Sequence, residues 1–326
     1  KIPDNMKRKI YFYMILLSWL LCAVACYDEK ELSPSGIISS YSVPQGEHDY
    51  DDVIVEYYNK YGSCLLYKFT DKDTYWTPSG WMNGVLGVNG KAGYLATPAD
   101  EKYVGEQLDL IQKLWFSSYS AEFLKEFLPM KIMLCSEIDS LYVTWDFSVT
   151  PMQMVYLSKD VRSWYNYDNI CVGYGDIAVT QMTKKDSSDF RSRMNRIFVE
   201  SMIGRGKTAP TKEFGESANY NISSSDMYTA SKLWAAGIPQ LVNYSISESN
   251  DWKTFLLMMV LSTEEFLTRV PEYNNNWDST SKNWDGILNP VKDVNGLLKK
   301  RYDMVRNYFI ENYNMDLQKV GNTLKR

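Results

Sequence analysis

Histidine is almost absent from this chain of 326 residues, and His48 is the single example. A zinc site that uses two or three imidazole ligands therefore cannot be assembled from the chain. His48 lies in the segment "GEHDYDD", near the expected start of a helix, so we interpret it as a surface residue. The neighbouring acids Asp49, Asp51 and Asp52 lack the regular alternation and the glycine of a calcium-binding loop.

Cysteine is also scarce, and common catalytic motifs are missing. Of the five cysteines, Cys22 lies in an N-terminal leader and Cys26 directly follows it, while Cys64, Cys135 and Cys171 lie in apolar, strand-like segments. No two of them have zinc-ligand spacing, so we expect buried thiols and at most one disulfide. The chain contains no P-loop, no dinucleotide-binding glycine signature and no Gly-x-Ser-x-Gly elbow.

The longest apolar run is short, at residues 10–21, and it follows the basic residues Lys7, Arg8 and Lys9. It is too short to cross a bilayer and predicts a secretory leader over residues 1–25. The leader ends in "Ala-Val-Ala-Cys", which resembles a bacterial lipobox whose cysteine, here Cys26, is lipidated. The alternative is a soluble secreted protein with an incidental cysteine at this position.

Net charge argues against nucleic acid as a partner. Residues 1–25 hold four of the 35 Lys and Arg and one of the 40 Asp and Glu, so the rest of the chain carries about −8. Such a chain does not favour polyanions or anionic lipid. Residues 26–46 are acidic and rich in Ser, Pro and Gly, which predicts a flexible tether. Acids after a lipidated cysteine resemble a surface-display signal, so we expect an outer-membrane lipoprotein that faces the periplasm or the cell exterior.

Hydrophobic periodicity places one folded domain at residues 47–326. The segment "DYDDVIVEYYNKYG" predicts a first helix with acids at its positive end and Gly62 as its stop, and the strand "CLLYKF" follows it. Residues 101–116 form a helix with Val104, Leu108, Ile111 and Trp115 on one face. Strand-like runs fill about 130–182, and further helices are predicted at about 187–204, 224–235, 251–269 and 290–312. This segregation predicts an α+β fold, with a mixed sheet followed by several helices.

The order of short sequence blocks resembles a family of lipoproteins from Gram-negative gut bacteria that are named as zinc-binding metallopeptidases. The blocks run in order "SPSGII", "YYNKYG", "LLYKF", "LWFSSYSAEFLKEFLPMKIMLCSEI", "GYGDIAVTQM", "APTKEF", "LVNYS", "STEEFL" and "YFIENYNMDLQKV". The resemblance covers nearly the whole chain after the leader. It implies a zincin-like fold, with "GYGDIAVTQM" as the strand before the active-site helix.

The active-site motif of that family is not preserved. Active members carry His-Glu-x-x-His on a helix, so that two imidazoles bind one zinc ion and the glutamate activates its water. The matching residues here are Val199-Glu200-Ser201-Met202-Ile203, in which only the glutamate agrees. Val199 and Ile203 cannot bind metal. Glu200 is then either a relic of the general base or a half-buried carboxylate paired with a basic neighbour.

A later block of the family, which the resemblance implies is a source of a third ligand, also departs from the pattern. It reads Glu264-Glu265-Phe266-Leu267-Thr268, with Thr268 in place of the closing glutamate. The resemblance further implies a cleft bordered by Glu200, Glu213, Tyr244, Glu264 and Glu265. The basic neighbours considered for Glu200 are Arg196, Arg205 and Lys207.

Two functions follow as hypotheses. The first is a membrane-anchored pseudopeptidase without catalytic activity or cofactor, held through Cys26, that binds a peptide or a glycan. The second is an active metallopeptidase that hydrolyses peptide bonds at an unconventional metal site, with zinc as its cofactor. All-carboxylate sites favour magnesium or calcium over zinc, which counts against the second hypothesis.

Overall fold

The computed structural model describes residues 41–77, 80–81 and 93–324. The chain forms two units, Lys1–Ser42 and Val43–Arg326, and every element discussed below belongs to the second. The predicted leader, the lipidation site Cys26 and most of the tether lie outside the described residues. Within the described part of the chain, no helix is long and apolar enough to cross a membrane.

The first helix of this unit, α2 (Asp49–Tyr61), begins and ends where the sequence predicts. Its N-cap is His48, whose backbone N–H donates to the Asp51 carboxylate over 2.9 Å. Three acids in the first turn stabilise the positive end of the helix dipole. The helix ends at Gly62, which adopts the left-handed conformation (φ 76°) that glycine tolerates best.

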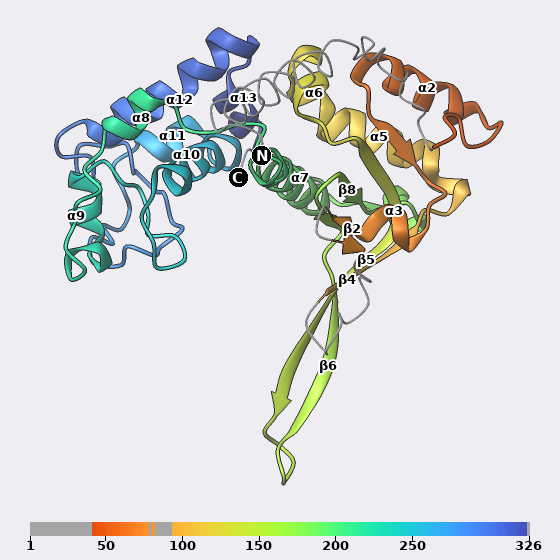
Figure 1. Cartoon of the computed structure of the whole chain (residues 1–326), viewed down its shortest axis with the longest axis horizontal. Coiled ribbons are helices and arrows are strands. Elements are labelled where there is room, and N and C mark those ends of the chain that lie inside the picture. Colours follow the sequence, from red (N-terminus) through yellow and green to blue (C-terminus); the bar gives the residue numbers. More distant parts are fainter. Residues whose placement is uncertain (1–40, 78–79, 82–92, 325–326) are drawn as a thin grey trace, which may run out of the picture. The chain divides into compact units, whose positions relative to one another are not determined.

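A six-stranded mixed sheet forms the centre of the N-terminal half (Figure 1). Its longest strand, β5, pairs in parallel with β1 and β8, and β7 lies antiparallel to β8 at the edge. Strands β4 and β6 pair antiparallel with the C-terminal part of β5. The strands are β1 (Cys64–Leu66), β4 (Gly93–Pro98), β5 (Lys131–Asp146), β6 (Gln153–Asp160), β7 (Ser163–Tyr165) and β8 (Asn169–Val172), and a separate hairpin joins β2 (Trp76–Thr77) and β3 (Gly80–Trp81).

Helices make up most of the remainder. Helix α7 contacts β7 and β8 as well as α10, so it connects the sheet to the C-terminal helices. The α-helices after α2 are α3 (Asp71–Tyr75), α5 (Val104–Leu114), α6 (Ala121–Phe127), α7 (Lys184–Gly204), α8 (Lys212–Glu216), α9 (Ala230–Ala235), α10 (Glu248–Leu261), α11 (Glu264–Thr268), α12 (Leu297–Tyr313) and α13 (Leu317–Asn322). Short 3₁₀ helices are η1 (Glu101–Tyr103), η2 (Phe116–Ser118), η3 (Ile177–Gln181) and η4 (Asp226–Tyr228).

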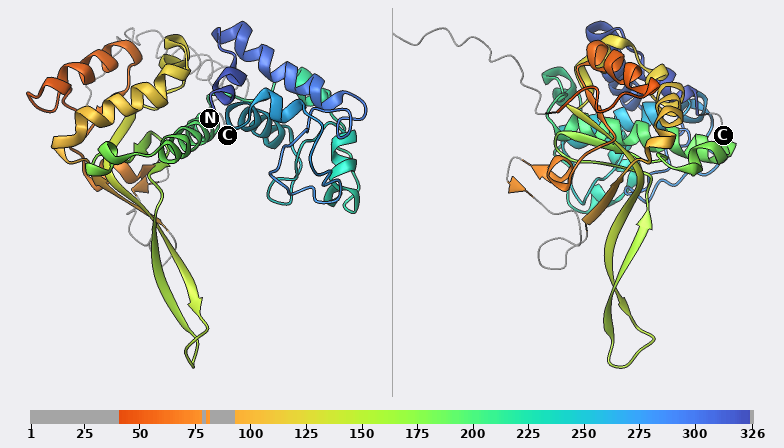
Figure 2. Two further views of the ribbon diagram at one scale, coloured as in Figure 1. Left: turned by 180° about the vertical axis from the view of Figure 1, so that it is seen from behind. Right: turned by 90° about the vertical axis from the view of Figure 1, so that its right-hand side faces the viewer.

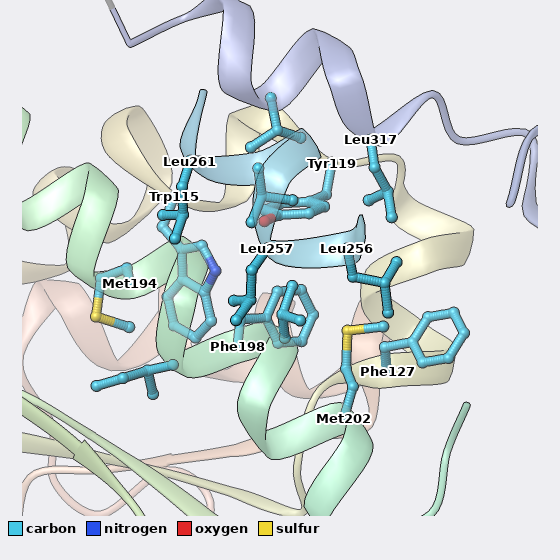
Figure 3. Close-up of a cluster of buried hydrophobic side chains, with 14 of the residues drawn as sticks. Trp115, Tyr119, Phe127, Met194, Phe198, Met202, Leu256, Leu257, Leu261 and Leu317 are labelled. Atoms are coloured by element: carbon cyan, nitrogen blue, oxygen red, sulfur yellow. The ribbon is translucent and has the colours of Figure 1, made fainter. Parts of the chain in front are cut away.

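A continuous hydrophobic core lies where α7, α10 and the helices of the N-terminal half meet. Figure 3 shows Phe198 and Met202 of α7 beside Leu256 and Leu257 of α10. Trp115, which closes the predicted apolar face after α5, is fully buried in the same cluster. The prediction of a mixed sheet together with several helices is confirmed, and Cys64, Cys135 and Cys171 are buried thiols that form no disulfide with one another.

Several predicted elements differ from the structure. The helix predicted at about 224–235 is the 3₁₀ helix η4 followed, after the extended Thr229, by the short helix α9. The segment "GYGDIAVTQM" is not a strand, because Asp176 accepts a hydrogen bond from the Ala178 N–H and starts the 3₁₀ helix η3. The predicted helix 251–269 is two helices, since Thr263 caps a new one. The last long helix starts after Gly296 rather than near 290, which leaves Val294, predicted on its apolar face, 69% exposed.

Candidate functional site

Helix α7 positions the residues that match the metallopeptidase motif. Thr183 caps its N-terminus by accepting the Asp186 N–H, and 21 residues of uninterrupted helix follow. Arg193, Arg196 and Glu200 recur at helical spacing on one half-buried stripe. The opposite side of the helix belongs to the core. Glu200 is therefore on the polar side of α7.

The two positions that would carry imidazole in an active member lie against the core. Val199 is 1% exposed, and Ile203 is partly buried against the same core cluster. Among the described residues, no group of three or more His, Cys, Asp or Glu side chains could hold a metal ion. The side chains present at 199, 200 and 203 thus do not fit a zinc ion, which needs nitrogen, sulfur or oxygen from several of them.

Glu200 forms an ion pair with Lys253 of α10, with 3.7 Å between its Oε1 and Nζ. Lys253 is the only residue between Asp251 and Leu261 that is not buried, so α10 directs this one side chain outward. The nearby Tyr165 hydroxyl has a raised pKa, mainly because of burial and also because of the negative charge of Glu200. Glu200 is therefore a half-buried, paired carboxylate.

The partners predicted for Glu200 are wrong. Arg205 donates to the Ser201 hydroxyl and to the Leu128 carbonyl, and Lys207 pairs with Glu126. Arg196 has no side-chain hydrogen bond or ion pair with the described residues. Lys253 escaped the sequence analysis because it is remote in sequence and no local pattern links it to α7.

The polar side of α7 also packs against the edge strand β7. Arg193 donates from Nε to the Ser163 hydroxyl over 3.1 Å and from Nη2 to the Ser163 carbonyl over 3.0 Å. At the C-terminal end of α7, a Cβ on Gly204 would lie 3.7 Å from the Tyr165 ring. An extended peptide that paired with β7 as a further strand would have to donate a backbone N–H to the Ser163 carbonyl. Arg193 already donates to that carbonyl.

The acids predicted from the later block lie elsewhere. Glu264 starts α11 and accepts from Arg306 over 2.8 Å, and Arg306 also pairs with Asp316. Helix α10 extends about 12 Å from Lys253 to its end before α11 begins. The exposed Thr268 hydroxyl donates to the Glu264 carbonyl.

The remaining predicted cleft residues are also dispersed. Glu265 borders a cavity of 410 Å³ with Phe266 and Arg269. Glu213 is exposed on α8, and Tyr244 is 77% exposed in a turn with φ 57°. No hydrogen bond or ion pair joins either residue to Glu200 within the described part of the chain. The structure thus does not gather the predicted cleft residues around Glu200.

A larger cavity of about 870 Å³ lies away from Glu200. It is open to one side, and segments far apart in sequence border it, which is why sequence reasoning missed it: α5, η3, the first turns of α7 and residues Thr323 and Leu324. Its lining residues are Glu106, Asp109, Leu110, Gln112, Lys113, Leu114, Val179, Met182, Lys184, Ser187, Ser188, Arg191, Thr323 and Leu324.

The cavity lining has charges of both signs as well as apolar side chains. Glu106 and Asp109 come from α5, and Lys184 and Arg191 come from α7. Arg191 donates from Nη1 to the Thr323 carbonyl over 2.9 Å, while its buried Nε has no partner in the described structure. No ion pair neutralises these charged groups within the described residues. They are available to a ligand that has charges of its own.

A second charged network was also missed and is structural. Arg301 of α12 and Asp251 of α10 are both fully buried and form an ion pair of 2.7 Å. The Tyr220 hydroxyl donates to the same Asp251 oxygen over 2.8 Å. Burial raises the pKa of Asp251 to about 6, while Arg301 opposes that shift. The pair joins α10 to α12 inside the protein, where no ligand reaches it.

Comparison with known proteins gives one distant structural similarity. No model of a known protein family matches the chain, and no curated protein does. A solved structure from Bacteroides caccae ATCC 43185, described as "a putative zinc-binding metallo-peptidase", is similar to this chain with a TM-score of 0.44 and 11% identity. The similarity covers 84% of this chain and 89% of that one. At this distance it assigns no family.

Proposed function

We propose that the protein is a catalytically inactive, zincin-like relative of metallopeptidases that binds peptides without cleaving them. The relationship rests on the ordered sequence blocks. The observation that supports inactivity best is the neighbourhood of Glu200, where Lys253 neutralises the carboxylate and Val199 fills a ligand position with buried carbon. A general base in a zinc peptidase must instead face a metal-bound water. The alternative of an unconventional metal site has no supporting observation among the described residues.

The cavity beside α5 is the proposed binding site. A short peptide has an ammonium group and a carboxylate at its two ends, and these match the acidic and basic groups around the cavity. The predicted alternative ligand, a neutral glycan, would use neither charge. No aromatic side chain of the described residues lines the cavity, so they offer a sugar ring no flat surface on which to stack.

Calorimetric titration with tri-alanine tests this proposal. We expect measurable binding of the free tripeptide, at least about tenfold weaker binding of its N-acetyl, C-amide form, and no binding of maltotriose. The expected ratio corresponds to about 1.4 kcal/mol or more, within the range for charge-assisted hydrogen bonds. Equal affinity for the free and blocked peptides would contradict the assignment of the charged groups.

Two variants on α7 locate the site. Arg191→Gln removes a cationic group that lines the cavity, and we expect at least about tenfold weaker tripeptide binding. Arg196→Gln is the matched control, because it lies on the same helix, outside the cavity lining and without a side-chain partner among the described residues. Loss of binding in both variants, or in neither, would place the peptide elsewhere.

We also propose that Cys26 is lipidated and anchors the protein to the outer membrane, facing the periplasm or the cell exterior. The support is the basic, apolar and small-residue order of residues 7–26. Metabolic labelling with palmitate in a Gram-negative host should label the wild-type protein and leave Cys26→Ser unlabelled. Protease treatment of intact cells then distinguishes the two orientations.

A further inference from the structure

The hairpin formed by β5 and β6 has an apolar arm, defined here as residues 141–158. It extends away from the helices in the views of Figures 1 and 2. Its only charged residue is Asp146. Eight large apolar side chains of the arm are between 38% and 78% exposed: Tyr142, Trp145, Phe147, Val149, Met152, Met154, Tyr156 and Leu157. So dense a group of exposed apolar side chains is unusual on a monomer surface and marks an interaction site.

The strand register gathers several of these side chains on one face. Val143 lies opposite Tyr156, and Trp145 lies opposite Met154. Directly opposite residues of an antiparallel pair point to the same side of the sheet. One face of the arm is therefore apolar over two successive residue pairs. The sheet face alone does not indicate the kind of partner, and the edge of β6 gives a further indication.

Among the described strands, only β5 pairs with β6, and the outer edge of β6 has no strand partner. Val161 donates its N–H to the Ile138 carbonyl over 2.9 Å. In an antiparallel pair the backbone groups alternate in direction, so those of residues 153, 155, 157 and 159 also face β5. The backbone groups of Met154, Tyr156 and Ser158 therefore face away from β5, and the described structure offers them no strand partner. Natural edge strands are usually protected by charges, prolines or bulges, and residues 153–158 have none of these.

This open edge argues against insertion of the arm into the hydrocarbon region of a membrane. Each unpaired backbone N–H and C=O group there would cost several kcal/mol. A partner that supplies backbone hydrogen bonds avoids this cost. Another strand therefore fits this edge better than a membrane does.

We propose that β6 pairs antiparallel with β6 of a second copy of this chain, around a two-fold axis at Tyr156. This register places Met154 opposite Ser158 of the second copy, so residues with outward-facing backbones meet one another. It also places Lys159 opposite Gln153 of the second copy, so no like charges meet. The contact is the same on both copies and closes as a dimer, which prevents further strand addition at this edge.

Sedimentation equilibrium of the full chain tests the dimer. We expect a monomer–dimer equilibrium whose dissociation constant rises roughly tenfold or more in Tyr156→Lys, because two ammonium groups then meet at the axis. Tyr228→Lys is the matched control: Tyr228 is 52% exposed and Tyr156 is 53% exposed, but Tyr228 belongs to η4. The control should associate like the wild type. A wild-type monomer at every accessible concentration overturns the proposal, and so does a dimer that Tyr156→Lys leaves intact.

A cysteine at the axis tests the register. In the proposed dimer the two Cα atoms of residue 156 are about 5.5 Å apart, within reach of a disulfide. Under mild oxidation Tyr156→Cys should give a dimer whose 156–156 link is found by mass spectrometry. Thr144→Cys on β5 should give no 144–144 link, since three strand spacings of about 4.8 Å separate the two sites. A 144–144 link, or absence of the 156–156 link, contradicts the pairing.

Discussion

Asp251 and Lys253 lie two residues apart on α10, and each forms an ion pair with a distant helix. Asp251 meets Arg301 of α12 where both side chains are fully buried. Lys253 meets Glu200 of α7, where the two side chains are 33% and 23% exposed. The buried pair belongs to the packing of the C-terminal helices. The partly exposed pair includes Glu200, the one residue that agrees with the metallopeptidase motif. Loss of a charge there should change the free energy of unfolding only slightly.

The largest expected effect is on the buried pair. Asp251→Ala leaves Arg301 as an uncompensated buried cation, and we expect the free energy of unfolding to fall by about 3–5 kcal/mol. Lys253→Ala is the matched variant on the same helix and should lower it by about 1 kcal/mol or less. Urea denaturation at neutral pH measures both. Similar losses for the two variants would remove the distinction between the pairs.

A pH series sharpens the same comparison. The pKa of Asp251 is raised to about 6 in the folded state from an ordinary value of 3.8, so the folded protein binds a proton more tightly than the unfolded chain. The resulting stabilisation is present at low pH and is lost as the pH rises from about 4 to about 6, by up to about 3 kcal/mol. The unfolding free energy of the wild type should therefore decrease over this window relative to Asp251→Asn. A constant difference would contradict the raised pKa.

The two ligand positions of the motif should respond differently to histidine. Val199 is almost fully buried, so Val199→His places a polar ring in the core and should destabilise the fold by about 2–3 kcal/mol. Ile203 is only partly buried, and Ile203→His should cost about 1 kcal/mol. Thermal unfolding of the two variants gives the order. The reverse order would contradict the deeper burial of Val199 compared with Ile203.

The smallest effect is expected at Glu200. Glu200→Gln removes the charge of a partly exposed pair and should change the unfolding free energy by less than about 1 kcal/mol. Its effect should shrink further in 1 M salt, because screening weakens the pair that is lost. Urea titrations at low and high salt measure this. A loss of several kcal/mol would mean that the pair is as important to the fold as Asp251–Arg301.

Local sequence signals predicted a good part of the fold. The acids after His48 and the glycine at 62 predicted the two ends of α2 correctly, because helix ends depend on nearby residues. The break before α11 also had a local signal that was not used: Ser262 and Thr263 precede two glutamates, which is typical of a helix start. The 3₁₀ helix η3 was missed because its apolar residues resemble a strand, and only the Asp176 cap distinguishes them.

The candidate sites depend on tertiary contacts that no local signal contains. The motif on α7 was correctly placed on a helix, but its glutamate pairs with Lys253, 53 residues away. The cavity requires α5, α7 and the C-terminus to meet. The strands of the hairpin were predicted from their apolar residues, whereas the exposure of those residues follows from where the arm extends beyond β4.

Metal binding by the purified wild-type protein tests the central claim most directly. We expect calorimetric titration with zinc chloride to show no saturable site that depends on Glu200, so that the wild type and Glu200→Gln give the same isotherm. One zinc ion bound per chain, lost in Glu200→Gln and accompanied by cleavage of a peptide substrate, would contradict the account.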